Sequence, residues 1–292
     1  MYIFRFFGLR VERLSHDDPI DFTESTNNPK SILYITNFKK QIIINAELSN
    51  GRGLDFFSLD CQSNHPFIAS LRMALLSNRP LTPELNEHLK AYYSLVQPST
   101  SSSWLGIKKK EYIKDDNSNL IKYVMPWENI SPQTKHKERN IVAKHDSQEH
   151  GEMLNLNDGW RNYGPISEKV LNLEVNRIMN LKNSIEKKGF KPSKRHGHIG
   201  AIVLLRSDDT WKWYVENGGQ HRAPVLSALG YKDIPIRVWK IINEDDASIW
   251  PNVVSGLYTE SEALKIFDNV CKGNNGQILE PWNKYLLEKN EI

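Results

Sequence analysis

Cysteine is scarce in this chain of 292 residues, which has two, Cys61 and Cys271. Two cysteines so far apart make neither a disulfide framework nor a metal motif, so a reduced, cytoplasmic setting is expected. No run of 18 apolar residues occurs, so no membrane span is expected. An excess of one charge is also missing, because 38 Lys and Arg against 35 Asp and Glu leave a net charge of +3. A dedicated nucleic-acid binder usually carries a stronger basic field, which argues against nucleic acid as a partner.

The first 105 residues have the pattern of a small α+β domain. Apolar, aromatic stretches separated by turn formers predict strands at 2–9, 31–36, 41–48 and 54–59. Asn50-Gly51 is typical of a hairpin turn. Two helices are expected next, one opened by His65-Pro66 and one by Thr82 as N-cap with Pro83 in the first turn. The role of this domain stays open between selecting an acceptor, forming a homodimer and docking a partner.

A polar linker or lid is predicted at 106–160. The serine-rich connector 97–103 places a domain boundary nearby. Residues 126–160 read as irregular, and long stretches without structure are often functional or disordered. Their scattered histidines lack ligand spacing, so no metal site is predicted. The end of the chain, 276–292, is predicted to be a tail.

The second predicted domain, 161–275, is organised around a strand, a tight turn and a helix. Apolar and polar residues alternate from 211 to 215, which is the period of a half-buried strand. Gly218 and Gly219 then permit a sharp turn and a close approach of the backbone to a ligand. Residues 223–229 have the apolar spacing of a short helix.

This turn is suited to a phosphate. A turn that opens a helix presents unpaired N–H groups at the positive end of the helix dipole. His221 adds a titratable donor, and Arg222 adds a fixed cation that can grip a phosphate through two parallel hydrogen bonds. A phosphate-binding turn is therefore predicted between the strand and the helix.

The segment Gly218-Gly219-Gln220-His221-Arg222 resembles the Gly-Gly-Cys-His-Arg motif of sulfiredoxin. It is also similar to the Asp-Gly-His-His-Arg type of motif in free serine kinases of the same ParB/sulfiredoxin superfamily. The flanks agree, since 181–190 resembles the helix before the first strand of such domains and 229–238 resembles the exit after the turn. The resemblance covers 165–242, and it implies an α/β domain with a mixed sheet after the N-terminal α+β domain. The fold class expected for the whole chain is α+β.

Two departures from these motifs limit the chemistry. Gln220 stands where sulfiredoxin has its nucleophilic cysteine, and an amide cannot do that work, so the sulfiredoxin reaction is not expected. Gly218 stands where the kinases have Asp, and Glu216 replaces that carboxylate only if the backbone geometry differs. The partition proteins continue into helix-turn-helix domains, and no such domain is evident after residue 242.

The resemblance implies a site that holds ATP or CTP with Mg²⁺. Gly218, Gly219, Gln220, His221 and Arg222 would hold the phosphates. Arg177 and His198 would reach the ligand from the helix 167–189 and from the loop before the strand 201–205. Glu174 is the nearest match to a catalytic glutamate of the kinases, while the alternative for it is a surface ion pair with Arg177.

Three functions follow as hypotheses. The first is a nucleotide-dependent phosphotransferase acting on a small molecule or sugar, with Glu174, Glu216 and His221 as catalytic residues. The second is a non-catalytic, nucleotide-gated module of the ParB type, which the missing Asp at Gly218 favours. The third is nucleic-acid binding or nuclease activity, which predicts an affinity that falls steeply with salt.

Overall fold

A seven-stranded mixed sheet forms the centre of the fold, and the chain belongs to the α+β class. The computed structural model describes residues 18–35, 41–108, 117–148, 151–192, 197–216, 218–274 and 276–290. Within them the strand order is β1-β2-β7-β5-β6-β3-β4. The strands are β1 (Ile20–Asp21), β2 (Ile42–Glu47), β3 (Gly51–Gly53), β4 (Phe57–Ser58), β5 (Ile199–Leu205), β6 (Trp211–Val215) and β7 (Asp233–Asn243).

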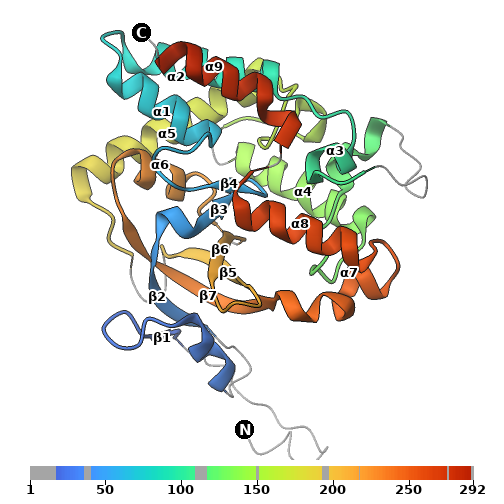
Figure 1. The fold of residues 1–292 in the computed structure, drawn as a ribbon. Helices are drawn as coiled ribbons and strands as arrows, with labels where there is room; N and C mark the ends of the chain where they lie inside the picture. The colour runs from blue at the N-terminus through green and yellow to red at the C-terminus, as the bar shows by residue number, and fades with distance from the viewer. Residues whose placement is uncertain are drawn as a thin grey trace, which may run out of the picture.

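Helices pack around this sheet in two groups. In Figure 1, α1, α2, α5 and α9 lie together above the sheet, with α6 beside them, whereas α3, α4, α7 and α8 gather on the other side of the view. The α-helices are α1 (Pro66–Leu76), α2 (Leu81–Leu95), α3 (Ser101–Leu105), α4 (Pro132–Gln148), α5 (Glu168–Lys188), α6 (Arg222–Ala228), α7 (Pro251–Val254), α8 (Glu260–Lys272) and α9 (Glu280–Asn290). Short 3-10 helices are η2 (Pro29–Tyr34), η3 (Leu48–Asn50), η4 (Asn117–Lys122), η5 (Leu156–Asp158), η6 (Glu244–Ile249) and η7 (Gly276–Leu279). Among the described residues, no helix is both long enough and apolar enough to cross a membrane.

Strands from both predicted domains share the sheet. β2 pairs antiparallel with β7, and β3 pairs parallel with β6. The predicted domain boundary near residue 105 therefore does not divide two sheets, because strands from both sides of it belong to one sheet. β7 lies between β2 and β5, so Pro235 does not lie on an edge strand. Pairing with β5 begins only at Ile236, so the missing N–H of Pro235 costs no bond to that strand.

The reversal between β3 and β4 lies four residues later than predicted. Gly51 belongs to β3 rather than to a hairpin turn, and a Cβ there would lie 2.4 Å from the Trp213 ring. The chain reverses instead through Leu54 and Asp55, with φ of +43° and +79°. Both angles are rare for residues other than glycine. The strand predicted at 54–59 is consequently reduced to β4.

Two other N-terminal predictions were also wrong. Residues 31–36 were predicted as a strand, but η2 forms because Asn28 accepts a hydrogen bond from the Lys30 N–H and Pro29 starts the turn. Helix α2 begins at Leu81 after Pro80, so Thr82 is not its N-cap. The strand predicted at 2–9 lies outside the described residues.

Two segments predicted to lack structure are helical. α4 occupies much of the predicted lid; it buries only Arg139 and Ser147 among the residues it contributes, so it carries almost no apolar period. The predicted tail forms η7 and α9, and the fully buried Trp282 anchors it. Both helices thus depend on a few long-range contacts that local patterns do not reveal.

The strand, turn and helix around residue 218 are confirmed, as is the helix at 167–189. Ser167 caps α5 through the Val170 N–H, and Gly189 ends it. The predicted capping box of Thr259 and Glu262 opens α8. These elements share strong local signals at both of their ends.

Candidate functional site

The glycine turn lies between β6 and α6, close against β5. Gly219 has φ +112°, and a Cβ on it would lie 2.7 Å from the Ile199 side chain. Gly218 has φ +74° and open space around it. Packing against β5 therefore requires Gly219, whereas Gly218 leaves the outer side of the turn accessible.

The start of α6 offers fewer donors than a phosphate cradle usually has. The Ala223 N–H already donates to the Gly219 carbonyl at 2.9 Å, and Pro224 has no N–H. The Arg222 guanidinium donates to the Gly197 carbonyl. Partial burial of Arg222 also lowers its pKa. A phosphate at this turn would have to compete for Arg222 with a backbone carbonyl.

His221 and Glu174, which the sequence assigned to the site separately, are in direct contact. His221 Nε2 pairs with Oε2 of Glu174, whose side chain is 3% exposed. The Phe67 ring stacks on the imidazole with ring centres 5.2 Å apart. Burial pushes the Glu174 pKa upward, but His221 and Arg177 outweigh it and hold this pKa at about 2. The ion pair with Arg177 that was the alternative for Glu174 is present, but it is buried and does not lie at the surface.

A chain of ion pairs runs from this contact toward α4. Arg177 Nη1 lies 3.2 Å from Glu174 Oε1 and 3.5 Å from Asp146 Oδ2. Arg161 Nη1 donates to the same Asp146 oxygen at 2.9 Å. The Arg161 guanidinium lies over the Trp160 ring, 4.7 Å from its centre. Arg177 thus bridges the carboxylates of Glu174 and Asp146, and Arg161 is the last residue in this series of ion pairs.

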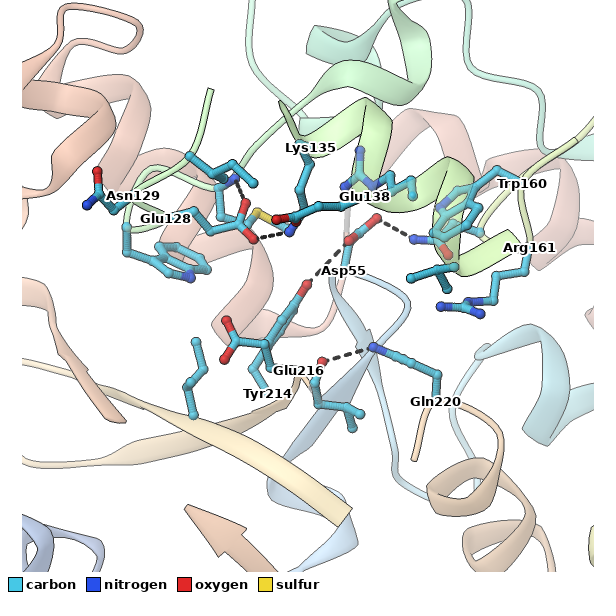
Figure 2. A pocket seen from close by; sticks show the side chains of 18 of the residues that line it. Asp55, Glu128, Asn129, Lys135, Glu138, Trp160, Arg161, Tyr214, Glu216 and Gln220 are labelled. Atoms are coloured by element: carbon cyan, nitrogen blue, oxygen red, sulfur yellow. Dashed lines mark hydrogen bonds and ion pairs between the residues drawn. The ribbon is translucent and has the colours of Figure 1, made fainter. Parts of the chain in front are cut away.

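Arg161 faces a cavity of about 500 Å³ between the sheet and α4. Glu216 and Gln220, which flank the glycine turn, line it together with Asp55 from the β3–β4 reversal and Lys240 from β7. Figure 2 shows Asp55 near the middle of this wall, between Tyr214 and the Trp160–Arg161 segment. The remaining lining comes mainly from residues 125–130 and from α4. The cavity is thus built by segments far apart in the sequence.

Asp55 is a buried carboxylate with hydrogen-bond donors on both oxygens. Oδ2 accepts from Trp104 Nε1 at 2.7 Å, from Asn162 Nδ2 at 2.6 Å and from the Tyr123 hydroxyl. Oδ1 accepts from the Tyr214 hydroxyl at 3.3 Å. Such a set keeps a buried carboxylate satisfied without a salt bridge.

Gln220 ties the turn to the Asp55 reversal. Its Oε1 accepts from the Leu54 N–H at 2.9 Å, and its Nε2 donates to the Val215 carbonyl at 2.9 Å. Gln220 is therefore placed as a structural bridge between β6 and the strained Leu54–Asp55 backbone. That position matches its chemistry, since an amide side chain both donates and accepts.

Glu216 lies at the cavity, with Trp239 Nε1 donating to it at 2.9 Å. Its side chain reaches solvent, yet the surrounding atoms and the facing Glu128 carboxylate raise its pKa. Glu128 is itself paired with Lys135. His198 stands just before β5, is partly buried and is not among the residues that line the cavity.

Sequence reasoning missed Asp55, Trp160 and Arg161. Asp55 lies inside a segment that was predicted as a strand, so the sequence pattern did not indicate its left-handed backbone conformation. The signal available for the other two was the loop chemistry of 157–165, where Asn, Asp, Gly and Pro surround a Trp and an Arg. No set of three or more His, Cys, Asp or Glu side chains in the described ranges is arranged to hold a metal ion.

Comparisons with known proteins add no family: no family model, curated protein or solved structure matches this chain.

Proposed function

We propose that the protein is a nucleotide-dependent phosphotransferase that acts on a hydroxyl group of a small molecule or sugar. One observation carries the proposal: His221, which is paired with the buried Glu174, directly follows Gln220, and Gln220 and Glu216 line a cavity of about 500 Å³ that His221 and Glu174 do not themselves line. Ligand cavities commonly have such a volume and combine aromatic with a few charged side chains. The resemblance of the turn to the ParB/sulfiredoxin motifs points to the same chemistry.

In this proposal His221 is the base and Glu174 positions it. A carboxyl group with a pKa of about 2 is a poor proton acceptor near neutral pH. An ionised Glu174 instead accepts a hydrogen bond from His221 Nε2, which leaves Nδ1 as the nitrogen that can take a proton. His221 takes the proton of the acceptor hydroxyl as that oxygen bonds to the terminal phosphorus. The bond from phosphorus to the bridging oxygen breaks, and a nucleoside diphosphate leaves.

The cavity residues fit a magnesium nucleotide. Arg161 uses one Nη for Asp146, so the other guanidinium N–H groups have no protein partner within the described residues and suit phosphate oxygens. The Lys240 ammonium donates one long hydrogen bond, 3.4 Å, to the Trp127 carbonyl, so it too suits a phosphate oxygen. Glu128 and Glu216 would hold Mg²⁺; burial and, after it, the Glu128 carboxylate raise the pKa of Glu216, and a cation would relieve the second effect. Bound Mg²⁺ supplies charge neutralisation at the phosphates.

A nucleotide-gated module without catalysis is the second candidate. The surroundings of Gly218 favour this candidate, because the space beside that residue is open and no carboxylate takes the place of the kinase Asp. Such a protein binds the nucleotide and changes shape but forms no product. Product formation therefore separates the two candidates.

The test combines binding with turnover. Thermal shift is measured with ATP, CTP and GTP, each with and without Mg²⁺, and a ligand at a hundred times its Kd adds about 2.7 kcal/mol. Release of nucleoside diphosphate is then followed with hydroxylated acceptors. His221→Ala is expected to keep nucleotide binding and to lower turnover by roughly 10²- to 10⁴-fold. The control is His136→Ala on α4, a residue outside the cavity lining.

Two outcomes would contradict the proposal. Absence of a shift with every nucleotide would remove nucleotide binding altogether. Full turnover in His221→Ala would remove the assigned base. Binding without any diphosphate release would favour the non-catalytic module.

A further inference from the structure

We propose that the cavity binds a neutral, polyhydroxylated ligand, a sugar or polyol, between the Asp55 carboxylate and the Trp160 indole N–H. The inference rests on the proposed function only for the role of this ligand as acceptor. The binding itself needs no nucleotide, so the two ideas can fail separately.

Trp160 provides an unused donor. The residue is 7% exposed, it lines the cavity, and its Nε1 has no hydrogen-bond partner among the described residues. An unsatisfied buried donor costs about 1–3 kcal/mol, and native proteins rarely leave one without a reason. An acceptor oxygen on a ligand would remove this cost.

Asp55 provides an acceptor with spare capacity. Its Oδ2 receives three donors, whereas Oδ1 receives only the Tyr214 hydroxyl, at a long 3.3 Å. A carboxylate oxygen has two lone-pair sites, so Oδ1 can accept another hydrogen bond. Both features belong to the same cavity wall.

The backbone holds Asp55 at some cost. Leu54 and Asp55 both have positive φ, and such conformations cost of order 1–3 kcal/mol each for residues other than glycine. Gln220 secures this reversal through the Leu54 N–H. Backbone strain that several contacts maintain is typical of ligand sites, and here it fixes the direction of one carboxylate.

The charge around the cavity favours a neutral ligand. Four carboxylates line it, those of Asp55, Glu128, Glu138 and Glu216. Four cationic side chains also line it, those of Lys135, Arg139, Arg161 and Lys240. Lys135 already pairs with Glu128, and Arg139 donates to two backbone carbonyls. In the proposed function Arg161 and Lys240 are taken up by the phosphates of the nucleotide, so the acceptor beside Asp55 and Trp160 meets no further unpaired cation, and a neutral ligand fits best.

A hydroxyl group matches both unused sites, because it donates and accepts at once. Hydroxyls on one ring could accept from Trp160 and donate to Asp55 in a single pose. The rings of Trp127 and Tyr214, which also line the cavity, provide apolar surface for the C–H face of such a ligand.

The test measures binding to the protein alone. D-glucose, D-galactose, N-acetyl-D-glucosamine, myo-inositol and glycerol are screened by saturation-transfer NMR, with glycine and succinate as charged comparators. Asp55→Asn deprives three buried donors of a charged acceptor and can impair folding, so Trp160→Phe is the decisive variant. It removes the unused N–H together with the five-membered part of the indole, and the control loses the same atoms. The control is Trp211→Phe, at the far end of β6.

At least one hydroxylated compound is expected to bind saturably, with Kd raised about tenfold in Trp160→Phe and unchanged in Trp211→Phe. Because Trp160→Phe loses buried ring atoms, its melting temperature is expected to fall, and Kd is measured well below the melting temperatures of both variants. Absence of binding by all five compounds, or equal affinity in Trp160→Phe, would overturn the inference. Preferential binding of glycine or succinate would overturn it as well. Nucleotide binding without sugar binding would leave the proposed function standing alone, and the reverse result would leave only this inference.

Discussion

Replacing Glu174 by Gln is expected to remove about 3 kcal/mol of stability near neutral pH. Burial opposes the charge on Glu174, but His221 and Arg177 hold its folded pKa at about 2, below the ordinary 4.5. A difference of that size between the folded and unfolded pKa corresponds to about 3 kcal/mol. Because the folded pKa is the lower one, this stability is present above about pH 4.5 and is lost as the pH falls toward 2.

The assay is urea unfolding of wild type and Glu174→Gln between pH 7 and pH 3. Wild type should lose stability in the acid part of this range more steeply than the variant. Glu168→Gln is the matched control, because Glu168 lies on the same helix in an exposed pair with Lys90, and exposed pairs contribute about 0–1 kcal/mol. Equal stability and equal acid slopes in wild type and Glu174→Gln would refute the reasoning.

Four further substitutions test the fold, two in the glycine turn and two at contacts of α8. Gly219→Ala should cost more than 1 kcal/mol in urea unfolding, since its φ is +112° and a Cβ meets Ile199 at 2.7 Å, whereas Gly218→Ala should cost about 1 kcal/mol, from backbone strain alone. Equal losses for the two glycines would contradict the packing argument. Arg52→Gln should lower the free energy of unfolding by roughly 1–3 kcal/mol, because this buried side chain donates to carbonyls at the end of α8. Thr259→Ala should cost about 1 kcal/mol as the loss of a helix cap, and an unchanged melting curve would show that α8 needs no cap.

Local chemistry made part of the fold predictable. The strand, glycine turn and short helix around Gly218 follow from alternation, from two glycines and from an apolar helix face, and the structure has them. The N-cap of α8 at Thr259 could also be predicted from the local sequence. In each case the residues that decide the element lie within a few positions of one another, so no distant contact is needed to settle it.

Distant contacts decide the two helices that sequence reasoning missed. Beyond the start of α4, where Ser131 Oγ accepts from the Thr134 N–H, its sequence has no apolar period, and Arg139 reaches across to the backbone at Ile121 and Tyr123. α9 depends on Trp282, whose Nε1 donates to the Asn64 carbonyl at 2.8 Å. Partners so far away along the chain leave no periodic pattern.

Part of the candidate site could be predicted from the sequence. Glu174 and His221 were each named from motif positions, and they meet because α5 and α6 pack side by side. Asp55 was not named, because its conformation depends on Gln220 reaching the neighbouring Leu54 N–H from another segment. The motif residue Gln220 was read as a ligand contact, whereas its amide is engaged twice with the protein.

The strand order has a consequence for synthesis. β2 and β3 pair with β7 and β6, which are made about 190 and about 160 residues later, respectively. At the usual 5–20 residues per second, both strands leave the ribosome roughly 8–40 s before their partners exist. During that interval their open edges are exposed to neighbouring nascent chains. A nascent chain stalled near residue 150 should therefore bind chaperones and be digested readily by protease, and both properties should change only after β7 has emerged.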